Sequence, residues 1–289
     1  MKYAFIRDHA KRWCIDVMCR VLETSVSGYR DFMRRPVSEE PARLLAHIRA
    51  VHQRSRGAYG WPRVWRALLA QGVVISKECT RLLMKTDGLQ GRQKRKFVVT
   101  TQRAAQDPVA QNVLDRRFDV IELNTVWAGD ITCIPTAEGW LFLAVVLDLA
   151  SRLIVGYAMA DHMRTELAIE ALTRACWRRK PGPGFIFHSD RGSQYTSAAY
   201  RQKLSDFDGV ASMSRKGNCW DNAPSESSFG SLKTERVHGA KYQTIEEAKQ
   251  DVLDWITWYN TERLHSTLGF KSPAAFEANL IQTHAAIAA

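Results

Sequence analysis

Three acidic residues, Asp130, Asp190 and Glu226, have the types and the order that metal-dependent chemistry on nucleic acid needs. Asp130 follows a strand-like run, Asp190 closes another, and Glu226 opens a segment with a helical pattern, so three elements could bring them together. Two Mg²⁺ ions need several hard carboxylate oxygens and open positions for phosphate and water. The three residues are therefore predicted to be catalytic ligands of two Mg²⁺ ions, which Mn²⁺ could replace, in the cleavage and joining of phosphodiesters.

The sequence motifs around the three carboxylates are more specific evidence of function than the spacing between them. Spacing alone is weak evidence, because the chain has 30 Asp and Glu residues and most acidic side chains are solvated surface groups. The motifs are Trp127-Ala-Gly-Asp-Ile-Thr, His188-Ser-Asp-Arg-Gly-Ser-Gln-Tyr, and Asn218-Cys-Trp-Asp-Asn-Ala-Pro-Ser-Glu-Ser followed by Lys233. Over nearly the whole chain, this set resembles the DDE transposases related to retroviral integrases. More narrowly, it is similar to the second-frame (OrfB) product of a large bacterial insertion-sequence family with two overlapping frames.

The resemblance implies a transposase that acts on the terminal inverted repeats of its own element. Hydrolysis at an end would expose a 3′-OH, which would attack a second phosphodiester and, in this family, first bridge the two ends of the element. Two alternatives stay open: a simple hydrolytic nuclease, and a DNA-binding regulator with an inactive nuclease-like domain. The resemblance also implies a homo-oligomer on DNA, with the upstream-frame (OrfA) product as a partner or fusion.

Positive charge is concentrated in the first part of the chain. Residues 1–120 carry 24 Lys and Arg against 11 Asp and Glu, whereas residues 121–289 carry 17 against 19. A basic arm ahead of a near-neutral globular region indicates that the first part holds a polyanion on which the second part works. We therefore predict a helix-turn-helix DNA-binding region at 1–95, a basic linker at 96–120, an integrase-like catalytic domain at 121–280 and a C-terminal tail at 281–289.

The basic region contains a helix-turn-helix pattern. Pro62 can open a helix that Gly72 ends, and Ser76 can cap the next helix, at 77–85, which could enter a major groove. Short amphipathic helix pairs are also common in proteins that never touch DNA. Further phosphate contacts are predicted from the linker, from polar loops beside the carboxylates and from the helix that carries Glu226. The predicted DNA-binding residues are Lys77, Arg81, Lys85, Arg92, Lys94, Arg95, Lys96, Arg191, Arg215, Lys216, Asn222 and Lys233.

The hydrophobic pattern changes from helical to strand-like near residue 124. We predict strands at 124–135, 140–148, 153–159, 185–188 and 209–213, with helices at 165–178, 196–204, 221–238 and 244–260. Three antiparallel strands followed by alternating helices and strands indicate an α/β, ribonuclease H-like core with a mixed five-stranded sheet and flanking helices. The all-α region before it should begin with two short helices within residues 9–35, with Trp13, Val17, Val21 and Leu22 on one side.

Asp148 is the strongest rival to the three carboxylates, because it ends a strand beside the first of them. A local ion pair with Arg152 at a hairpin is the simpler interpretation, so Asp148 is left out of the metal site. His188 and Ser189 could orient Asp190 through hydrogen bonds. An isolated histidine on a strand is, however, more often a packed core residue.

Cysteine usage and hydropathy place the chain among cytoplasmic, nucleoid-associated proteins. The six cysteines form no CxxC pair and have no histidine at zinc-finger spacing, which indicates reduced thiols. Charges come too early at the N-terminus for a signal peptide, and the longest apolar run, residues 141–147, is too short to span a bilayer. We therefore expect no membrane partner.

Overall fold

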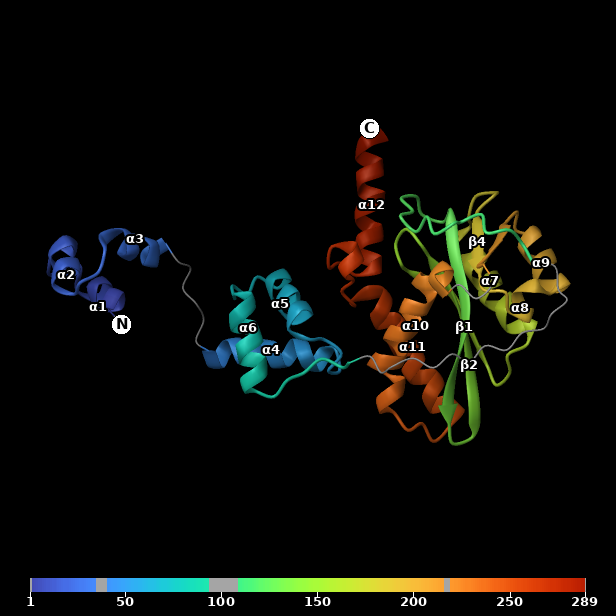
Figure 1. Cartoon of the computed structure of the whole chain (residues 1–289), viewed down its shortest axis with the longest axis horizontal. Coiled ribbons are helices and arrows are strands. Elements are labelled where there is room, and N and C mark those ends of the chain that lie inside the picture. The colour runs from blue at the N-terminus through green and yellow to red at the C-terminus, as the bar shows by residue number, and fades with distance from the viewer. Residues whose placement is uncertain (1, 35–40, 94–108, 216–218, 289) are drawn as a thin grey trace.

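The computed structural model describes residues 2–34, 41–93, 109–215 and 219–288. Figure 1 shows a small helical unit at the N-terminus, a second helical unit after it, and an α/β domain from which the last helix projects. The three parts follow one another along the chain. The α/β domain holds all the predicted metal ligands.

The first unit consists of α1 (Lys2–His9), α2 (Ile15–Val21) and α3 (Val26–Arg34). Two details of its prediction are wrong. Residues before 9 are helical, and most of the proposed apolar side is exposed, with Trp13, Val17 and Val21 keeping 45, 51 and 75% of their surface. Only Leu22 of that side packs against the core. Ile6 of α1 completes the core, and α2 turns Met18 and Cys19 toward it. The residues that form this core are Ile6, Met18, Cys19 and Tyr29.

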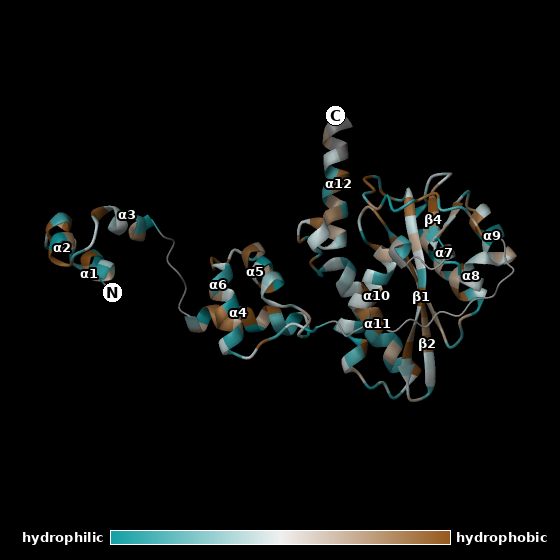
Figure 2. Ribbon diagram, viewed as in Figure 1, coloured by the Kyte–Doolittle hydropathy of each residue, from teal (hydrophilic) through white to brown (hydrophobic). Residues whose placement is uncertain are grey.

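The second unit is the predicted helix-turn-helix region, built from α4 (Pro41–Arg54), α5 (Trp61–Ala70) and α6 (Lys77–Thr86). Pro62 lies in the first turn of α5, and the Ser76 hydroxyl accepts the Cys79 N–H at 3.1 Å at the start of α6, as the sequence predicted. Hydrophobic and hydrophilic residues fall on different sides of α4 and α5 (Figure 2). The apolar sides meet in a core that includes Leu44, Ile48, Val64, Leu68 and Met84.

The α/β domain contains one mixed five-stranded sheet. Its strands are β1 (Val126–Thr136), β2 (Gly139–Asp148), β3 (Ile154–Ala160), β4 (Ile186–Ser189) and β5 (Val210–Met213). They lie in the order β3-β2-β1-β4-β5. β1, β2 and β3 are antiparallel neighbours, whereas β4 runs parallel to β1 and β5 parallel to β4. This is the predicted ribonuclease H-like fold, with the first strand at the centre.

Helices cover both faces of the sheet because the strands are buried on both sides. One face packs through Trp127 and Phe187 against α7 (Thr165–Arg179), α8 (Ser193–Thr196) and α9 (Ala198–Ser205). The other face packs through Leu143 against α10 (Ala223–Glu235) and α11 (Ile245–Thr261). A 3₁₀ turn, Cys219–Asn222, precedes α10, so the predicted helix at 221–238 starts slightly later than expected.

The hairpin between β2 and β3 corrects the prediction for Asp148. This carboxylate is fully buried and accepts main-chain N–H groups from Asn124 at 2.7 Å, Ala150 at 2.8 Å and Ser151 at 3.2 Å. The Arg152 guanidinium instead donates to the Phe118 carbonyl at 3.1 Å. Asp148 therefore closes the turn through backbone groups, and the predicted ion pair with Arg152 does not form within the described part of the chain.

The helix-turn-helix region lies against α11 and the segment that follows it. Arg54 pairs with Glu262 at 2.7 Å, and Arg56 pairs with Asp251 at 2.7 Å. Residues 109–120, the second half of the predicted linker, lie along the α/β domain, where Leu114 joins the core; residues 96–108 are outside the described residues. The last helix, α12 (Pro273–Ala288), continues into the predicted tail.

No helix in the described ranges is long and apolar enough to cross a membrane. Five cysteines are free thiols: Cys14, Cys19, Cys79, Cys133 and Cys176.

Candidate active site

Asp130 and Asp190 come from neighbouring parallel strands. Ala128 of β1 pairs with His188 of β4, and both aspartates follow their paired residue by two positions. They therefore lie level with each other, Asp130 within the central strand β1 and Asp190 directly after the carboxyl end of β4. The backbone before Asp130 is packed tightly, because a Cβ at Gly129 would clash with the Phe187 ring.

Main-chain groups hold the two aspartates. The Ile131 N–H donates to Asp130 Oδ1 at 2.8 Å, and the Gly192 N–H donates to Asp190 Oδ1 at 2.9 Å. The Ser189 hydroxyl donates to the Asp190 carbonyl at 2.9 Å. These bonds hold both carboxylates against the backbone.

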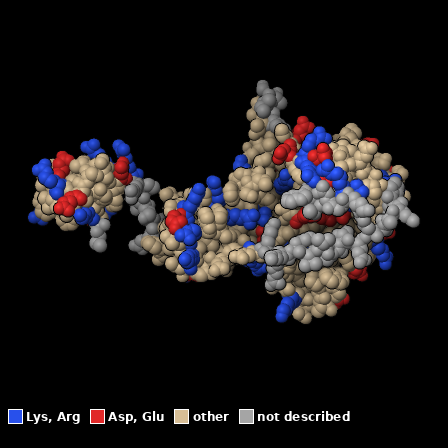
Figure 3. All heavy atoms as spheres, in the orientation of Figure 1, with Lys and Arg blue, Asp and Glu red and all other residues tan. Residues whose placement is uncertain are grey.

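Glu226 comes from the opposite layer. It lies in the first turn of α10, which packs on β1, and its side chain is exposed. Lys233 is two helical turns further on, so it shares the face of α10 that carries Glu226. β1, the residue after β4 and α10 thus bring the three carboxylates close enough to interact electrostatically. On the face drawn in Figure 3, acidic side chains gather in the middle of the α/β domain.

The carboxylates oppose one another electrostatically. Burial, followed by the negative charge of Asp190, raises the pKa of Asp130 to about 8. Glu226 raises the pKa of Asp130 further, while the Ile131 hydrogen bond and Lys233 lower it. Burial and Asp190 also raise the pKa of Glu226. A cation between these groups would remove the repulsion and favour their ionised forms.

The donor set fits a hard divalent ion, although the side chains are not closed around one. Within the described ranges, no group of three or more His, Cys, Asp or Glu is arranged to hold a metal ion as it stands. Carboxylate oxygens without nearby soft ligands suit Mg²⁺ or Mn²⁺. At the start of α10, the buried Asn222 Oδ1 and Ser225 Oγ have no hydrogen-bond partner among the described residues. Two polar atoms beside the site are therefore without a hydrogen bond from the described side chains.

Tyr195 is a neighbour of the aspartates that the sequence did not single out. Its ring is buried, and the negative charges of Asp130 and Asp190 contribute, after burial, to raising the pKa of its hydroxyl. The ring belongs to an aromatic cluster with Phe187 and Tyr200. Tyr195 therefore forms part of the wall on which the two aspartates lie.

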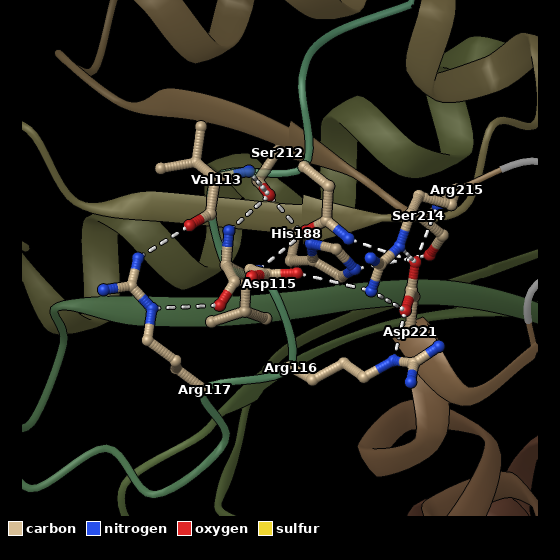
Figure 4. A network of polar contacts seen from close by, with 11 residues as sticks. Val113, Asp115, Arg116, Arg117, His188, Ser212, Ser214, Arg215 and Asp221 are labelled. Atoms are coloured by element: carbon tan, nitrogen blue, oxygen red, sulfur yellow. Dashed lines mark hydrogen bonds and ion pairs between the residues drawn. The ribbon is translucent and has the colours of Figure 1, made fainter.

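His188 has a packing role rather than the predicted orienting role. Its Nδ1 lies 2.9 Å from Ser212 Oγ and its Nε2 lies 3.3 Å from Ser214 Oγ. Both ring nitrogens thus contact β5 and the residue after it, and burial lowers the pKa of the ring. Ser212 Oγ also accepts the N–H of Val113 at 3.0 Å, which ties residues 109–117 to the sheet (Figure 4).

Asp221 organises the start of α10 and was missed as a functional position. Its buried carboxylate accepts the main-chain N–H of Arg215 at 2.8 Å, two bonds from the Arg215 guanidinium at 3.0 Å, and one each from Arg116 at 2.7 Å and Asn112 at 3.1 Å (Figure 4). The Arg215 hydrogen bonds hold the pKa of Asp221 well below its usual range. The word Trp-Asp-Asn before Glu226 could have suggested this anchor.

The predicted loop contacts to DNA have internal partners. Arg191 Nε donates to the Ser214 carbonyl at 2.6 Å, and Arg215 is engaged by Asp221. Lys216 is outside the described residues. Arg191 and Arg215 therefore shape the loops beside the carboxylates, and contact with DNA would have to use their remaining donors.

The predicted DNA-binding residues of the helix-turn-helix region lie on or after α6. Lys77 Nζ lies 4.9 Å from the centre of the Trp65 ring, and Arg81 pairs with Glu78 along the same helix. Lys85 is exposed in the last turn. Arg92 donates to the Glu235 carbonyl at 2.9 Å, while Lys94, Arg95 and Lys96 lie outside the described residues.

Comparison with known proteins supports the same architecture. Family models described as an integrase core domain match residues 122–219 and 210–273, and a model described as an HTH-like domain matches residues 39–97. The chain is 40% identical to the transposase InsF for insertion sequence IS3A of Escherichia coli (strain K12), with 96% of this chain and 98% of InsF covered.

A second relative comes from Shigella sonnei. The insertion element IS600 uncharacterized 31 kDa protein is 40% identical over 90% of this chain and 97% of its own length. Among solved structures, the HTLV-2 integrase catalytic core domain is 15% identical, with a TM-score of 0.40, and covers 52% of this chain and 94% of that chain.

Proposed function

This chain belongs to the family of IS3 insertion-sequence transposases, and on that premise we propose that Asp130, Asp190 and Glu226 are its catalytic metal ligands. The family carries out DNA transposition and integration as DDE polynucleotidyl transferases, and the chain has both the integrase core and the HTH-like domain. The observation that carries the proposal is the convergence of three mutually repelling carboxylates from β1, β4 and α10.

The roles of the side chains follow from their places. Asp130 and Asp190, held by main-chain N–H groups, would be ligands of two Mg²⁺ ions, and Glu226 would complete the ligand set from α10. When bound, the ions would lower the pKa of the attacking water or 3′-OH and stabilise the leaving 3′ oxygen. Such a mechanism needs no covalent link between a protein side chain and DNA.

Lys233 and Asn222 would position the DNA strand. Lys233 lies on the carboxylate face of α10 and opposes the rise in the pKa of Asp130, so its ammonium is close enough to attract a phosphate held at the metal ligands. Asn222 ends the turn before α10, and its buried side-chain oxygen has no hydrogen-bond partner among the described residues. Its amide NH₂ would support the DNA strand, and Asn222 would not be a ligand of the ions.

The DNA sequence that the chain binds and the proteins that it assembles with are also part of the proposal. The helix-turn-helix region would hold the terminal inverted repeats of the element, with α6 as the helix in the groove. The active form would be an oligomer that brings two ends together, assisted by or fused to the upstream-frame (OrfA) product. DNA as the substrate follows from the family.

A strand-joining assay tests the proposal. Labelled duplexes from the ends of the element that encodes the chain are incubated with Mg²⁺, and cleaved and joined products are measured separately. We expect joined products that disappear in Asp130→Asn. Cleavage without joining would identify a hydrolytic nuclease, and unchanged products in Asp130→Asn would remove that residue from the site.

A further inference from the structure

A polar cavity lies between the helix-turn-helix region and the α/β domain. Its volume is about 460 Å³, and α5, α10, the end of α11 and the β2–β3 hairpin contribute to its walls. Its charged lining is one-sided, with four arginines against a single carboxylate: Arg63, Arg92, Arg152, Arg263 and Glu235. A cavity with this excess of guanidinium groups is suited to an anion.

The one carboxylate is already satisfied by its neighbours. Glu235 accepts bonds from Arg263 at 2.7 and 2.9 Å and from the Trp255 indole N–H at 3.0 Å, and both charged side chains are about 4% exposed. Arg263 also donates to the Ser231 hydroxyl at 2.9 Å. This pair neutralises itself, which leaves the other three arginines to set the charge of the cavity.

None of those three arginines is hydrogen-bonded to a carboxylate within the described residues, although Asp119 and Asp148 act on Arg152 electrostatically. Arg63 is 3.8 Å from Glu235, beyond hydrogen-bonding distance, and its guanidinium lies over the Tyr59 ring. Arg92 and Arg152 donate to main-chain carbonyls, those of Glu235 and Phe118. A carbonyl orients a guanidinium without cancelling its charge, so the donors that remain on each group can meet an anion.

Burial and the positive potential of the cavity lower the pKa of two groups in its wall, Arg63 and His265. Burial and then Arg263 lower the pKa of Arg63. Burial, followed by Arg263, Arg63 and Arg152, lowers the pKa of His265 to about 3. His265 is therefore neutral near pH 7 and adds no charge. The potential comes from the arginines alone.

The cavity lies on the far side of the catalytic helix. Ser231 and Glu235 of α10 point away from the face that carries Glu226, because they are offset by about half a helical turn. The hydroxyl groups of Ser227, Ser266 and Thr267 also line the cavity, and these three residues are exposed. A ligand can therefore enter from solvent and reach the arginines within.

We propose that this junction cavity binds the sugar–phosphate backbone of DNA, at a phosphate separate from the one that the carboxylates act on. The proposal rests on the proposed function in that DNA is taken as the substrate. Backbone rather than base is favoured, because guanidinium and hydroxyl groups donate to phosphate oxygens without reading sequence. A phosphate held there would contact both α5 of the helix-turn-helix region and α10, and so fix their relative position on one DNA molecule.

The test measures binding without catalysis. The full chain in EDTA is titrated into a fluorescent duplex taken from an end of the element, at several salt concentrations, for wild type, Arg63→Gln and Arg152→Gln. Each variant should weaken binding about tenfold and make the slope of log affinity against log salt shallower by about 0.9, the value for one phosphate contact. Arg178→Gln, an exposed arginine on the opposite side of the sheet, is the matched control.

A second pair of variants covers the event that a half-buried arginine cannot be replaced without unfolding. Thr267→Glu adds a negative charge at the exposed mouth and should weaken binding, whereas Ser205→Glu on α9 should not. Inorganic phosphate is tested as a free competitor by thermal shift. Wild-type affinity and slope in Arg63→Gln, Arg152→Gln and Thr267→Glu would overturn the proposal, and stabilisation by phosphate alone with those results would identify a small-anion site instead.

The two proposals fail separately. Binding in EDTA does not depend on metal ligands, so an active Asp130→Asn would overturn the catalytic assignment and leave the cavity result unaffected. Unaltered DNA binding in the cavity variants would equally leave the catalytic proposal in place.

Discussion

Two aspartates, Asp130 in β1 and Asp221 in the turn before α10, have opposite surroundings. Asp130 shares its place with Asp190 and Glu226, and burial and their charge raise its pKa to about 8. Asp221 is fully surrounded by donors from Arg215, Arg116 and Asn112, and its pKa lies well below the usual range. One carboxylate is held where ionisation is unfavourable, and the other where ionisation is fully compensated.

The opposite pKa shifts of Asp130 and Asp221 distinguish a functional carboxylate from a structural one. Compensated buried charges hold a structure together, and removing one partner leaves the others unpaired. Carboxylates that repel one another lower stability unless something else binds them, which is typical of functional positions. Asp221 therefore fixes the start of α10, and the stored repulsion at Asp130 is relieved by the ion that it is proposed to bind.

The largest expected effect is on catalysis. Asp130→Asn, Asp190→Asn and Glu226→Gln should each lower cleavage and joining by about a thousandfold or more, because metal coordination contributes several kcal/mol to the transition state. DNA affinity in EDTA should stay within about twofold of wild type. The exposed Asp161→Asn is the matched control. If any of these three variants joins strands at the rate of the control, the replaced residue is not a catalytic metal ligand.

Asp221→Asn should act through folding. Losing a buried carboxylate that accepts charged hydrogen bonds should lower the free energy of unfolding by about 2 kcal/mol, measured by urea denaturation. Because the folded pKa is depressed, this contribution is present above the unfolded pKa of about 3.9 and is lost as pH falls. The gap between wild type and variant should close in acid. An equally stable variant at pH 7 would contradict the supporting role.

Lys233 should have an intermediate effect on activity. Lys233→Ala should reduce joining about tenfold, the equivalent of about one charge-assisted hydrogen bond, and Lys233→Arg should retain most activity because the charge remains. Crosslinking to the terminal nucleotides would show whether positioning is lost. If Ala and wild type crosslink and join alike, the residue is a surface lysine.

The smallest expected effect is a gain in stability. In EDTA at pH 8, Asp130→Asn should raise the free energy of unfolding by about 1 kcal/mol, because it removes mutual repulsion. A raised folded pKa makes the metal-free wild type lose stability as pH rises from about 4 to about 8, and the variant should lose less. Mg²⁺ should then stabilise wild type more than the variant. Thermal melts with and without Mg²⁺ measure both.

Local pattern was enough to predict most of the α/β domain. β1 to β5 lie within two residues of the expected ranges, because alternating and continuous apolar runs follow directly from burial in a sheet. The placement of Asp130 beside Asp190 also followed, since strand order determines which carboxylates meet. These are properties of single elements and of one topology.

Predictions failed where a partner far away in the chain decides the outcome. Val17 and Val21 fit an inward stripe as well as Met18 does, and only the unforeseen α1 selects between them. The bonds of Asp148 come from its own turn and from Asn124, which proximity to Arg152 did not reveal. The junction cavity combines arginines from four separate segments, so no local window contains it.

The most direct test of the central claim is an anomalous difference map of crystals of the chain with Mn²⁺ and a duplex from an element end. The account predicts Mn²⁺ peaks between Asp130, Asp190 and Glu226, with a carboxylate oxygen of each residue directly coordinating an ion. Peaks at Asp221 or Asp148, or Mn²⁺ bound without Asp130, would contradict it.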